Sequence, residues 1–316
     1  MKVKFTKMQG CGNDYIYIYG PDMPEWRELP GERKAGLVRW MSDRHFGLGA
    51  DGVIWIHPAP ETADAADFEM EMYNADGSRA EMCGNGIRCV AKYVYDKGWT
   101  EKTKLRIASC GKVKLLELSI EDGKTVSVKV NMGAPVLNAA DIPVVSKNVT
   151  AVAEEIEANG TVYKMTCVSM GNPHAVFFVE EEDILNGWFL ERENAGEDGA
   201  DRFGREVVAG LGPLIEKHSR FPKKTNVEFV KVLDCRTVQM RVWERGTGET
   251  LACGTGACAA VAACILNNLT EEEVTVKLLG GDLNIRWERK ENLVYMTGPA
   301  EIVFDGEVEL PVGFFQ

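Results

Sequence analysis

The sequence lacks the features of two large classes of protein. None of its apolar runs is long enough to span a membrane. Its formal net charge is −12, so it has no general excess of basic residues with which to bind nucleic acid. We therefore expect neither a membrane nor a nucleic-acid partner. A small anionic substrate is compatible with this charge, because a helix N-terminus can bind a carboxylate whatever the charge of the whole chain.

Signals of export and of paired cysteines are also missing. Residues 1–5 have no signal-peptide pattern and lead directly into strand-like sequence. The nine cysteines are an odd number with no Cys-x-x-Cys spacing, which disfavours a structural zinc site and a redox dithiol. We expect reduced thiols and a cytoplasmic protein. The 316 residues, 45% of them hydrophobic, predict about two globular domains.

The most informative feature that is present is a repeated cysteine motif. Cys83 is followed by Gly-Asn-Gly and Cys253 by Gly-Thr-Gly, and helical periodicity follows each motif, over 87–97 and 257–266. A thiol at the start of a helix meets backbone N–H groups and a dipole that favour negative charge. One such motif is more often a buried small residue and a turn, but two copies indicate a site built from two related halves.

The repeat extends beyond the two motifs. A strand-like run ends nine positions before each cysteine, at Asn74 in the first half and at Glu244 in the second. A turn begins 27 positions after each cysteine, at 110–111 and at 280–281. This period is far too long for a solenoid, so the repeat indicates a duplicated domain, with the boundary near 132–135.

Alternation of apolar and polar residues dominates the rest of the chain. It predicts strands over 15–19, 53–56, 68–73, 126–130, 176–179, 227–232, 238–243 and 274–278. Further helices are predicted over 35–44 and 205–218, and the alanine-rich helix at 257–266 is expected in a tight central environment. One central helix among many strands in each half predicts α+β domains with the helix wrapped by sheet. The acidic segment 180–201 is expected to be a solvated excursion.

Two cysteines from related halves suit the inversion of a carbon that carries one hydrogen. A proton leaves one face of the carbon and another arrives on the opposite face, so one base and one acid are needed. A thiolate and a thiol supply that pair. The N–H groups of 84–85 and 254–255 can bind a substrate carboxylate and stabilise the charge that moves onto it in the transition state. The glycines of the motifs permit a close approach of backbone and ligand.

Other polar residues lie in motifs that suit a site. Asn13 and Asn172 lie just before matching apolar strands, and His174 is a candidate to orient or deprotonate a cysteine. Each candidate also has a structural interpretation. A lone histidine is more often structural, the pair Glu244-Arg245 can be a solvated ion pair, and Asn226 can belong to a turn.

Taken together, these motifs resemble those of diaminopimelate epimerases. The similarity runs from Met8 to Gly298 and rests most specifically on five motifs, at 74–78, 83–86, 170–174, 244–246 and 253–258. That family interconverts LL- and meso-diaminopimelate without pyridoxal phosphate or metal, on the route to lysine and peptidoglycan. The resemblance implies a homodimer with no cofactor. It also implies two pseudo-symmetric α+β domains, each a barrel-like, mostly antiparallel sheet around a central helix, formed by 1–131 with about 300–316 and by 132–299.

The resemblance further implies a role for each candidate residue. Cys83 and Cys253 are the acid/base pair, and His174 and Glu244 assist the thiols or contact the substrate. The substrate carboxylate is bound at the helix starts by Gly84, Asn85, Gly254 and Thr255. The distal end of the substrate is held by Asn13, Asn74, Asn172, Asn226, Glu244 and Arg245. The chain differs from some members at Gly52, where they have a glutamine, and from the more common serine at Thr255.

Several alternatives stay open at this point. Related folds act on proline, hydroxyproline or histidine, whereas relatives of phenazine-pathway isomerases lack the two cysteines. Proline offers no distal carboxylate for Arg245 and the asparagines to bind, but a histidine racemase would need only one or two changes in the pocket. A non-enzymatic thiol switch is a different class, in which one cysteine alone would support the behaviour.

Overall fold

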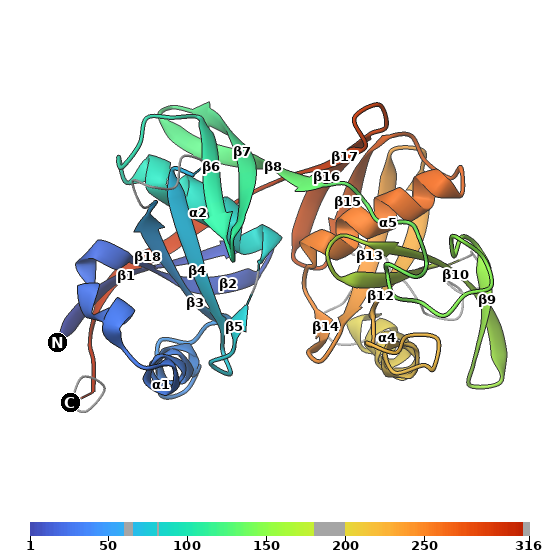
Figure 1. The fold of residues 1–316 in the computed structure, drawn as a ribbon, viewed down its shortest axis with the longest axis horizontal. Helices are drawn as coiled ribbons and strands as arrows, with labels where there is room; N and C mark the ends of the chain where they lie inside the picture. The colour runs from blue at the N-terminus through green and yellow to red at the C-terminus, as the bar shows by residue number, and fades with distance from the viewer. Residues whose placement is uncertain (60–65, 81, 180–199, 312–316) are drawn as a thin grey trace. The chain divides into compact units, whose positions relative to one another are not determined.

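The chain divides into two compact units. The structure is a computed structural model that describes residues 1–59, 66–80, 82–179 and 200–311. Unit 1 comprises Met1–Asn131 and Thr297–Gln316, and unit 2 comprises Met132–Met296 (Figure 1). Most of the acidic segment at 180–201 therefore lies outside the described residues.

Unit 1 is built from strands and two α-helices. Its strands are β1 (Lys2–Gly10), β2 (Asn13–Tyr19), β3 (Gly52–Pro58), β4 (Phe68–Asn74), β5 (Arg79–Ala80), β6 (Lys104–Ser109), β7 (Lys112–Glu121), β8 (Lys124–Gly133) and β18 (Glu301–Glu309). Its helices are η1 (Gly20–Asp22), η2 (Pro24–Glu28), α1 (Gly31–Ser42) and α2 (Gly84–Asp96). The strands pair in the order β18-β1-β2-β3-β4-β6-β7-β8, antiparallel except for the parallel pairs β2–β3 and β4–β6.

Unit 2 repeats this arrangement. Its strands are β9 (Glu154–Ala158), β10 (Thr161–Ser169), β11 (Pro173–Phe178), β12 (Asn226–Asp234), β13 (Thr237–Glu244), β14 (Gly248–Thr250), β15 (Glu273–Leu278), β16 (Gly281–Glu288) and β17 (Leu293–Gly298), and its α-helices are α4 (Ala200–Glu216) and α5 (Gly254–Leu266). The order is β9-β10-β11-β12-β13-β15-β16, with parallel pairs β11–β12 and β13–β15. The two parallel pairs therefore occupy equivalent places in both units, which is the structural form of the sequence repeat.

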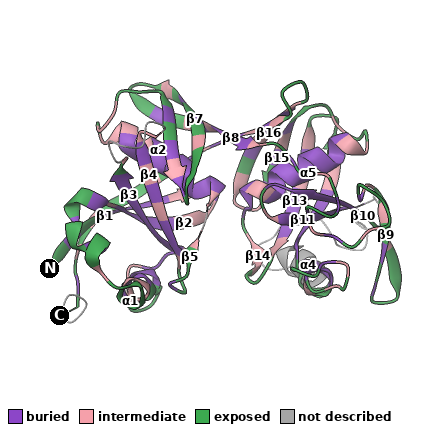
Figure 2. Ribbon diagram, viewed as in Figure 1, coloured by how far each residue is buried: buried purple, intermediate pink, exposed green. Residues whose placement is uncertain are grey.

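A central helix lies against the sheet in each unit. The helix α5 contacts β10, β11, β12, β13, β15 and β16, and α2 contacts β1, β2, β6, β7 and β18. Nearly every residue of α5 is buried (Figure 2). Its many alanines and glycines let strands approach from several sides, because they carry almost no side chain. The expected α+β class and the central position of the alanine-rich helix are confirmed.

The boundaries of the predicted elements differ in instructive ways. All eight predicted strands fall on observed strands, and the helices at 35–44 and 205–218 correspond to α1 and α4. The first predicted turn lies at Cys110-Gly111, whereas the second lies at Leu279-Gly280, one residue earlier than expected. Both central helices start three residues before the predicted position, directly after the cysteine. Among the described residues, no helix is long and apolar enough to cross a membrane.

Candidate active site

The two motif cysteines occupy the same structural position in their units. Cys83 is the N-cap of α2 and Cys253 the N-cap of α5, both with extended backbone, at φ −130° and −124°. Each thiol accepts a hydrogen bond from the N–H of the glycine three residues on, at 3.3 Å for Gly86 and 3.4 Å for Gly256. The Gly-Asn-Gly and Gly-Thr-Gly segments thus form the first helical turn, whose N–H groups have no acceptor within the helix.

In unit 1, Asn13 lies beside Cys83. The Cys83 thiol donates to Asn13 Oδ1 at 3.2 Å, and Asn13 Nδ2 donates to Asp51 Oδ2 at 2.8 Å. A carboxylate only accepts, so Asp51 fixes which end of the amide faces the thiol. Asp51 is itself paired with Arg44, at 2.9 Å. The structure therefore places Asn13 where it orients the proton of Cys83.

The other two candidate asparagines of unit 1, Asn74 and Asn85, have local partners. Asn74 ends β4, and its Nδ2 donates to Ser78 Oγ at 3.1 Å within the following turn. Asn85 is buried, and its Oδ1 accepts from Arg88 Nη1 at 3.0 Å. The Asn85 side chain therefore faces Arg88, and its backbone N–H belongs to the first turn of α2.

In unit 2, His174 lies at the centre of a buried polar group. Its ring is fully buried, with Nδ1 2.6 Å from Glu228 Oε1 and Nε2 3.1 Å from Asn172 Oδ1. Asn226 pairs with His174 across the parallel strands β11 and β12. It donates to the Pro173 carbonyl at 3.0 Å and accepts from the N–H of Arg245 at 2.8 Å. These contacts join three segments of the chain, 172–174, 226–228 and Arg245.

Glu244 and Cys253 form a second polar group in unit 2, with Cys253 buried and Glu244 half-buried. Burial raises the pKa of Cys253 well above its ordinary value of 9.0, the charges of Glu244 and Glu228 raise it further, and the Thr255 hydroxyl and Gly256 N–H oppose the shift. Burial also raises the pKa of Glu244, against hydrogen bonds from Thr250 and Cys253. At Cys253, burial raises the pKa by more than the hydrogen bonds at the helix start lower it. The Cys253 thiol is therefore harder to ionise than an ordinary cysteine, although it lies at a helix start.

Thr255 and Arg245 complete the set predicted from the sequence. The Thr255 hydroxyl lies 3.5 Å from the Cys253 sulfur, and its N–H belongs with that of Gly254 to the first turn of α5. Arg245 follows β13 on the exposed surface, where its Nη1 donates to the Lys223 carbonyl at 3.0 Å. The guanidinium therefore retains donors that are free to meet a ligand carboxylate.

Two residues of the site were missed by the sequence analysis, Asp51 and Glu228. Both are acidic, and each fixes the side chain of a candidate residue, Asn13 or His174. Glu228 did give a signal, since it interrupts an apolar strand, Val227 to Val230, on the same face as Asn226. A charged residue inside a buried strand is rare unless it has a partner.

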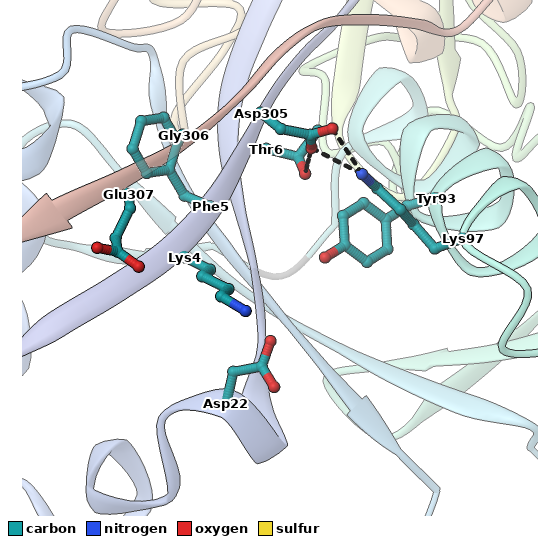
Figure 3. A pocket seen from close by; sticks show the side chains of 9 residues that line it. All are labelled: Lys4, Phe5, Thr6, Asp22, Tyr93, Lys97, Asp305, Gly306 and Glu307. Atoms are coloured by element: carbon teal, nitrogen blue, oxygen red, sulfur yellow. Dashed lines mark hydrogen bonds and ion pairs between the residues drawn. The ribbon is translucent and has the colours of Figure 1, made fainter.

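A separate cavity in unit 1 does not belong to this site. It measures about 380 Å³ and is lined in part by Tyr93, Lys97 and Asp305, with the last two joined in an ion pair of 2.7 Å (Figure 3). Tyr93 lies ten residues after Cys83 on α2, which is roughly 15 Å along a helix. In the part of the chain that the structure describes, no group of three or more His, Cys, Asp or Glu could hold a metal ion.

Comparison with known proteins gives a consistent picture. The family profile described as "Diaminopimelate epimerase" matches residues 5–138 and 166–303. A protein named diaminopimelate epimerase from Methanococcus maripaludis strain C5 is 50% identical over 308 residues, covering 98% of this chain and all of the relative. The protein of that name from Acetivibrio thermocellus is also 50% identical, covering 98% of this chain and 99% of the relative.

Solved structures share the fold at low sequence identity. A hydroxyproline epimerase from Agrobacterium vitis has a TM-score of 0.65 at 15% identity and covers 97% of this chain, with 91% of its own chain matched. A phenazine biosynthesis protein of the PhzF family from Bacillus anthracis has a TM-score of 0.64 at 14% identity, covering 98% of this chain and all of that chain. At such identities the likeness concerns the fold alone.

Proposed function

Since this chain belongs to the diaminopimelate epimerase family and is an isomerase, we propose that it converts LL-diaminopimelate to meso-diaminopimelate by a two-cysteine acid/base mechanism without a cofactor. The observation that supports the mechanism is the equivalent position of the two thiols, each the N-cap of a central helix. In this proposal residues 1–131 with about 300–316 form the half that carries Cys83, and residues 132–299 form the half that carries Cys253.

In the proposed reaction, one cysteine takes the α-proton and the other delivers a proton to the opposite face. The substrate carboxylate accepts N–H bonds from the first turns of α2 and α5, which strengthen as charge moves onto it. Glu244 exchanges a proton with Cys253, because the two side chains are hydrogen-bonded neighbours and a carboxylate can accept the proton of a thiol. His174 assists a thiol, and Arg245 with the asparagines binds the distal end.

Proton NMR of the reduced protein with LL-diaminopimelate in deuterium oxide, without added cofactor, tests this proposal. The expected result is the meso isomer with deuterium at one α-carbon. No exchange in a fully reduced sample would reject the substrate, and histidine would be tested next. The low identity to the hydroxyproline epimerase, set against 50% to proteins named diaminopimelate epimerase, favours the latter substrate.

The two-cysteine mechanism makes a sharp prediction for single variants. Cys83→Ser and Cys253→Ser should each reduce turnover by several orders of magnitude, since a serine hydroxyl is far less acidic than a thiol and cannot replace it as a proton carrier. Full epimerase activity in either variant would contradict two-base catalysis and favour a thiol switch. We further propose that the enzyme acts in the cytoplasm as a homodimer, in the synthesis of lysine and peptidoglycan precursors, and sedimentation analysis tests the dimer.

A further inference from the structure

We propose that Glu228 is a positioning residue that fixes the Nδ1–H form of His174 and so makes Nε2 the nitrogen that exchanges protons. The catalytic consequence rests on the proposed function, but the effect on the histidine does not. No sequence motif pointed to this glutamate, and it acts through His174 rather than on the substrate.

The neighbours of His174 determine which of its ring nitrogens carries a hydrogen. Glu228 and His174 are both fully buried, and Oε1 of Glu228 lies 2.6 Å from Nδ1. A carboxylate can only accept, so Nδ1 must carry a hydrogen. On the other side, Nε2 faces the amide of Asn172 at 3.1 Å. An amide can accept or donate after a half-turn, so Asn172 tolerates Nε2 both with and without its proton.

A purely structural role explains Glu228 poorly. Its strand neighbours Val227, Phe229 and Val230 are fully buried and apolar, and an apolar residue at 228 would avoid the cost of desolvating a carboxylate. Its second oxygen, Oε2, has no hydrogen-bond partner among the described residues. A buried carboxylate that uses one oxygen on a histidine is the arrangement that orients imidazoles in many catalytic sites.

Glu228 also connects His174 to the start of α5. A Cβ at Gly256 would lie 2.7 Å from Glu228 Oε1, so the carboxylate lies close against the first turn, where the helix dipole favours negative charge. The titratable groups around it are His174 on β11, Glu244 on β13, Cys253 before α5 and Cys167 on β10. The charge of Glu228 raises the pKa of Glu244, Cys253 and Cys167.

The first experiment observes the histidine directly. The chain has four histidines, so ¹⁵N-histidine labelling of the full protein gives four resolvable rings, and His174 is assigned by its loss in His174→Asn. We expect Nδ1 of wild-type His174 to stay protonated from pH 6 to 9. In Glu228→Gln the amide can also donate, so the Nε2–H form should appear. Glu228→Asp keeps an obligate acceptor and should keep the Nδ1–H form. A neutral Nε2–H ring in the wild-type protein would overturn the proposal.

The second experiment measures kcat/KM against pH. Glu228→Gln should lower kcat/KM at least about 10-fold, by loss of the correct tautomer. It should also shift the profile toward lower pH, because Glu244 and Cys253 lose a negative neighbour. Glu71→Gln is the matched control: Glu71 also binds a buried histidine, His57 at 3.2 Å, but it lies on β4 in unit 1, whereas His174 lies in unit 2. An unshifted profile in Glu228→Gln, or an equal shift in the control, would reject the role.

These two readouts separate the two proposals. If wild-type protein does not epimerise diaminopimelate but His174 shows the expected Nδ1–H ring and responds to Glu228→Gln, the proposed substrate is wrong and the positioning stands. If diaminopimelate is epimerised but the His174 ring is unchanged in Glu228→Gln, the proposed substrate stands and the positioning role of Glu228 is wrong.

Discussion

At the scale of single residues, the candidate site is a set of proton positions fixed by acidic neighbours. Asp51 fixes the amide of Asn13, and Asn13 Oδ1 accepts a hydrogen bond from the Cys83 thiol. Glu228 fixes His174 in the same way. Asn13, His174 and the two cysteines could be chosen as candidates from the sequence because they lie in repeated or unusual motifs. The motifs did not identify Asp51 and Glu228. The amide or imidazole that each acid faces depends on how the strands pair, and no local sequence pattern contains that information.

Removal of the Asp51 charge should change the chemistry of Cys83. Asp51→Asn frees the Asn13 amide to turn its NH₂ toward the sulfur, which favours the thiolate over the thiol. We expect Cys83 to be alkylated faster by iodoacetamide near neutral pH, and kcat/KM to fall about 10-fold, the effect of one lost hydrogen bond of roughly 1.4 kcal/mol. Peptide mapping by mass spectrometry measures the alkylation. Asp14→Asn is the control, because Asp14 pairs with the same Arg44 but not with the Asn13 side chain. Equal alkylation in both variants would contradict the assignment.

We expect Arg245 to contribute to substrate binding and not to the stability of the fold. The residue is exposed and its guanidinium donates to the Lys223 carbonyl, so Arg245→Ala should leave the denaturation midpoint almost unchanged. A substrate carboxylate would lose a charge-assisted partner, which costs on the order of 2–5 kcal/mol. We expect KM to rise and kcat to fall together in steady-state assays. An unchanged kcat/KM would exclude Arg245 from the site.

At the scale of elements, the helix starts show where sequence reasoning stopped short. Cysteine is not among the usual N-caps, and glycine is a poor helix former, so the pattern placed the helices at Ile87 and Ala257. The structure begins them at Gly84 and Gly254. Strands were easier to place, because a run such as Val227 to Val232 is rich in valine and is buried as far as Val230. The order of the strands was not predictable, since parallel pairs such as β11–β12 join segments about fifty residues apart.

Gly86 and Gly256, each three residues after a motif cysteine, should respond differently to substitution by alanine. At Gly86 a Cβ would approach Ile54 Cδ1 at 2.8 Å, the mobile end of an aliphatic side chain. At Gly256 it would approach Glu228 Oε1 at 2.7 Å, and that oxygen is held by His174. Alanine gains about 1 kcal/mol of helix propensity over glycine, against roughly 1–3 kcal/mol for overpacking. Gly86→Ala should therefore be near neutral in urea denaturation, whereas Gly256→Ala should lose stability and activity. Equal responses would indicate that the Glu228 carboxylate can move aside.

At the scale of the whole molecule, the duplicated architecture places similar helices in two chemically different units. The repeated motif and its flanks predicted two α+β units before any strand order was known, because a duplicated sequence requires a duplicated core. The units then diverge in what the core contains. Unit 2 buries Cys167, Cys258 and Cys264 in addition to Cys253, whereas unit 1 buries Cys11 and, beside Tyr17, Cys89. These differences determine how each unit should respond to alkali.

Alkaline pH should destabilise unit 2 before unit 1. Burial raises the pKa of Cys167 and Cys264 to about 12 and that of Cys89 to about 11, from an ordinary value of 9.0. Above pH 9 the unfolded chain loses these protons while the folded chain keeps them, so the free energy of unfolding falls as pH rises, by up to about 1.4 kcal/mol per pH unit for each thiol. The tyrosines of unit 1 respond later, since their ordinary value is 10.0.

At pH 9.5 the loss relative to pH 8 should be on the order of 1 kcal/mol for each buried thiol. Because the pKa is raised for Cys167, Cys253 and Cys264 in unit 2 and for Cys89 in unit 1, unit 2 should lose more stability than unit 1. Pulse proteolysis in urea at both pH values, with fragments assigned to residues 1–131 or 132–296, measures the two units separately. Cys264→Ala should flatten the pH dependence of unit 2 even where it lowers stability at pH 8, since alanine has no proton to retain. Equal losses in the two units, or an unchanged slope in that variant, would show that the buried thiols do not govern alkaline stability.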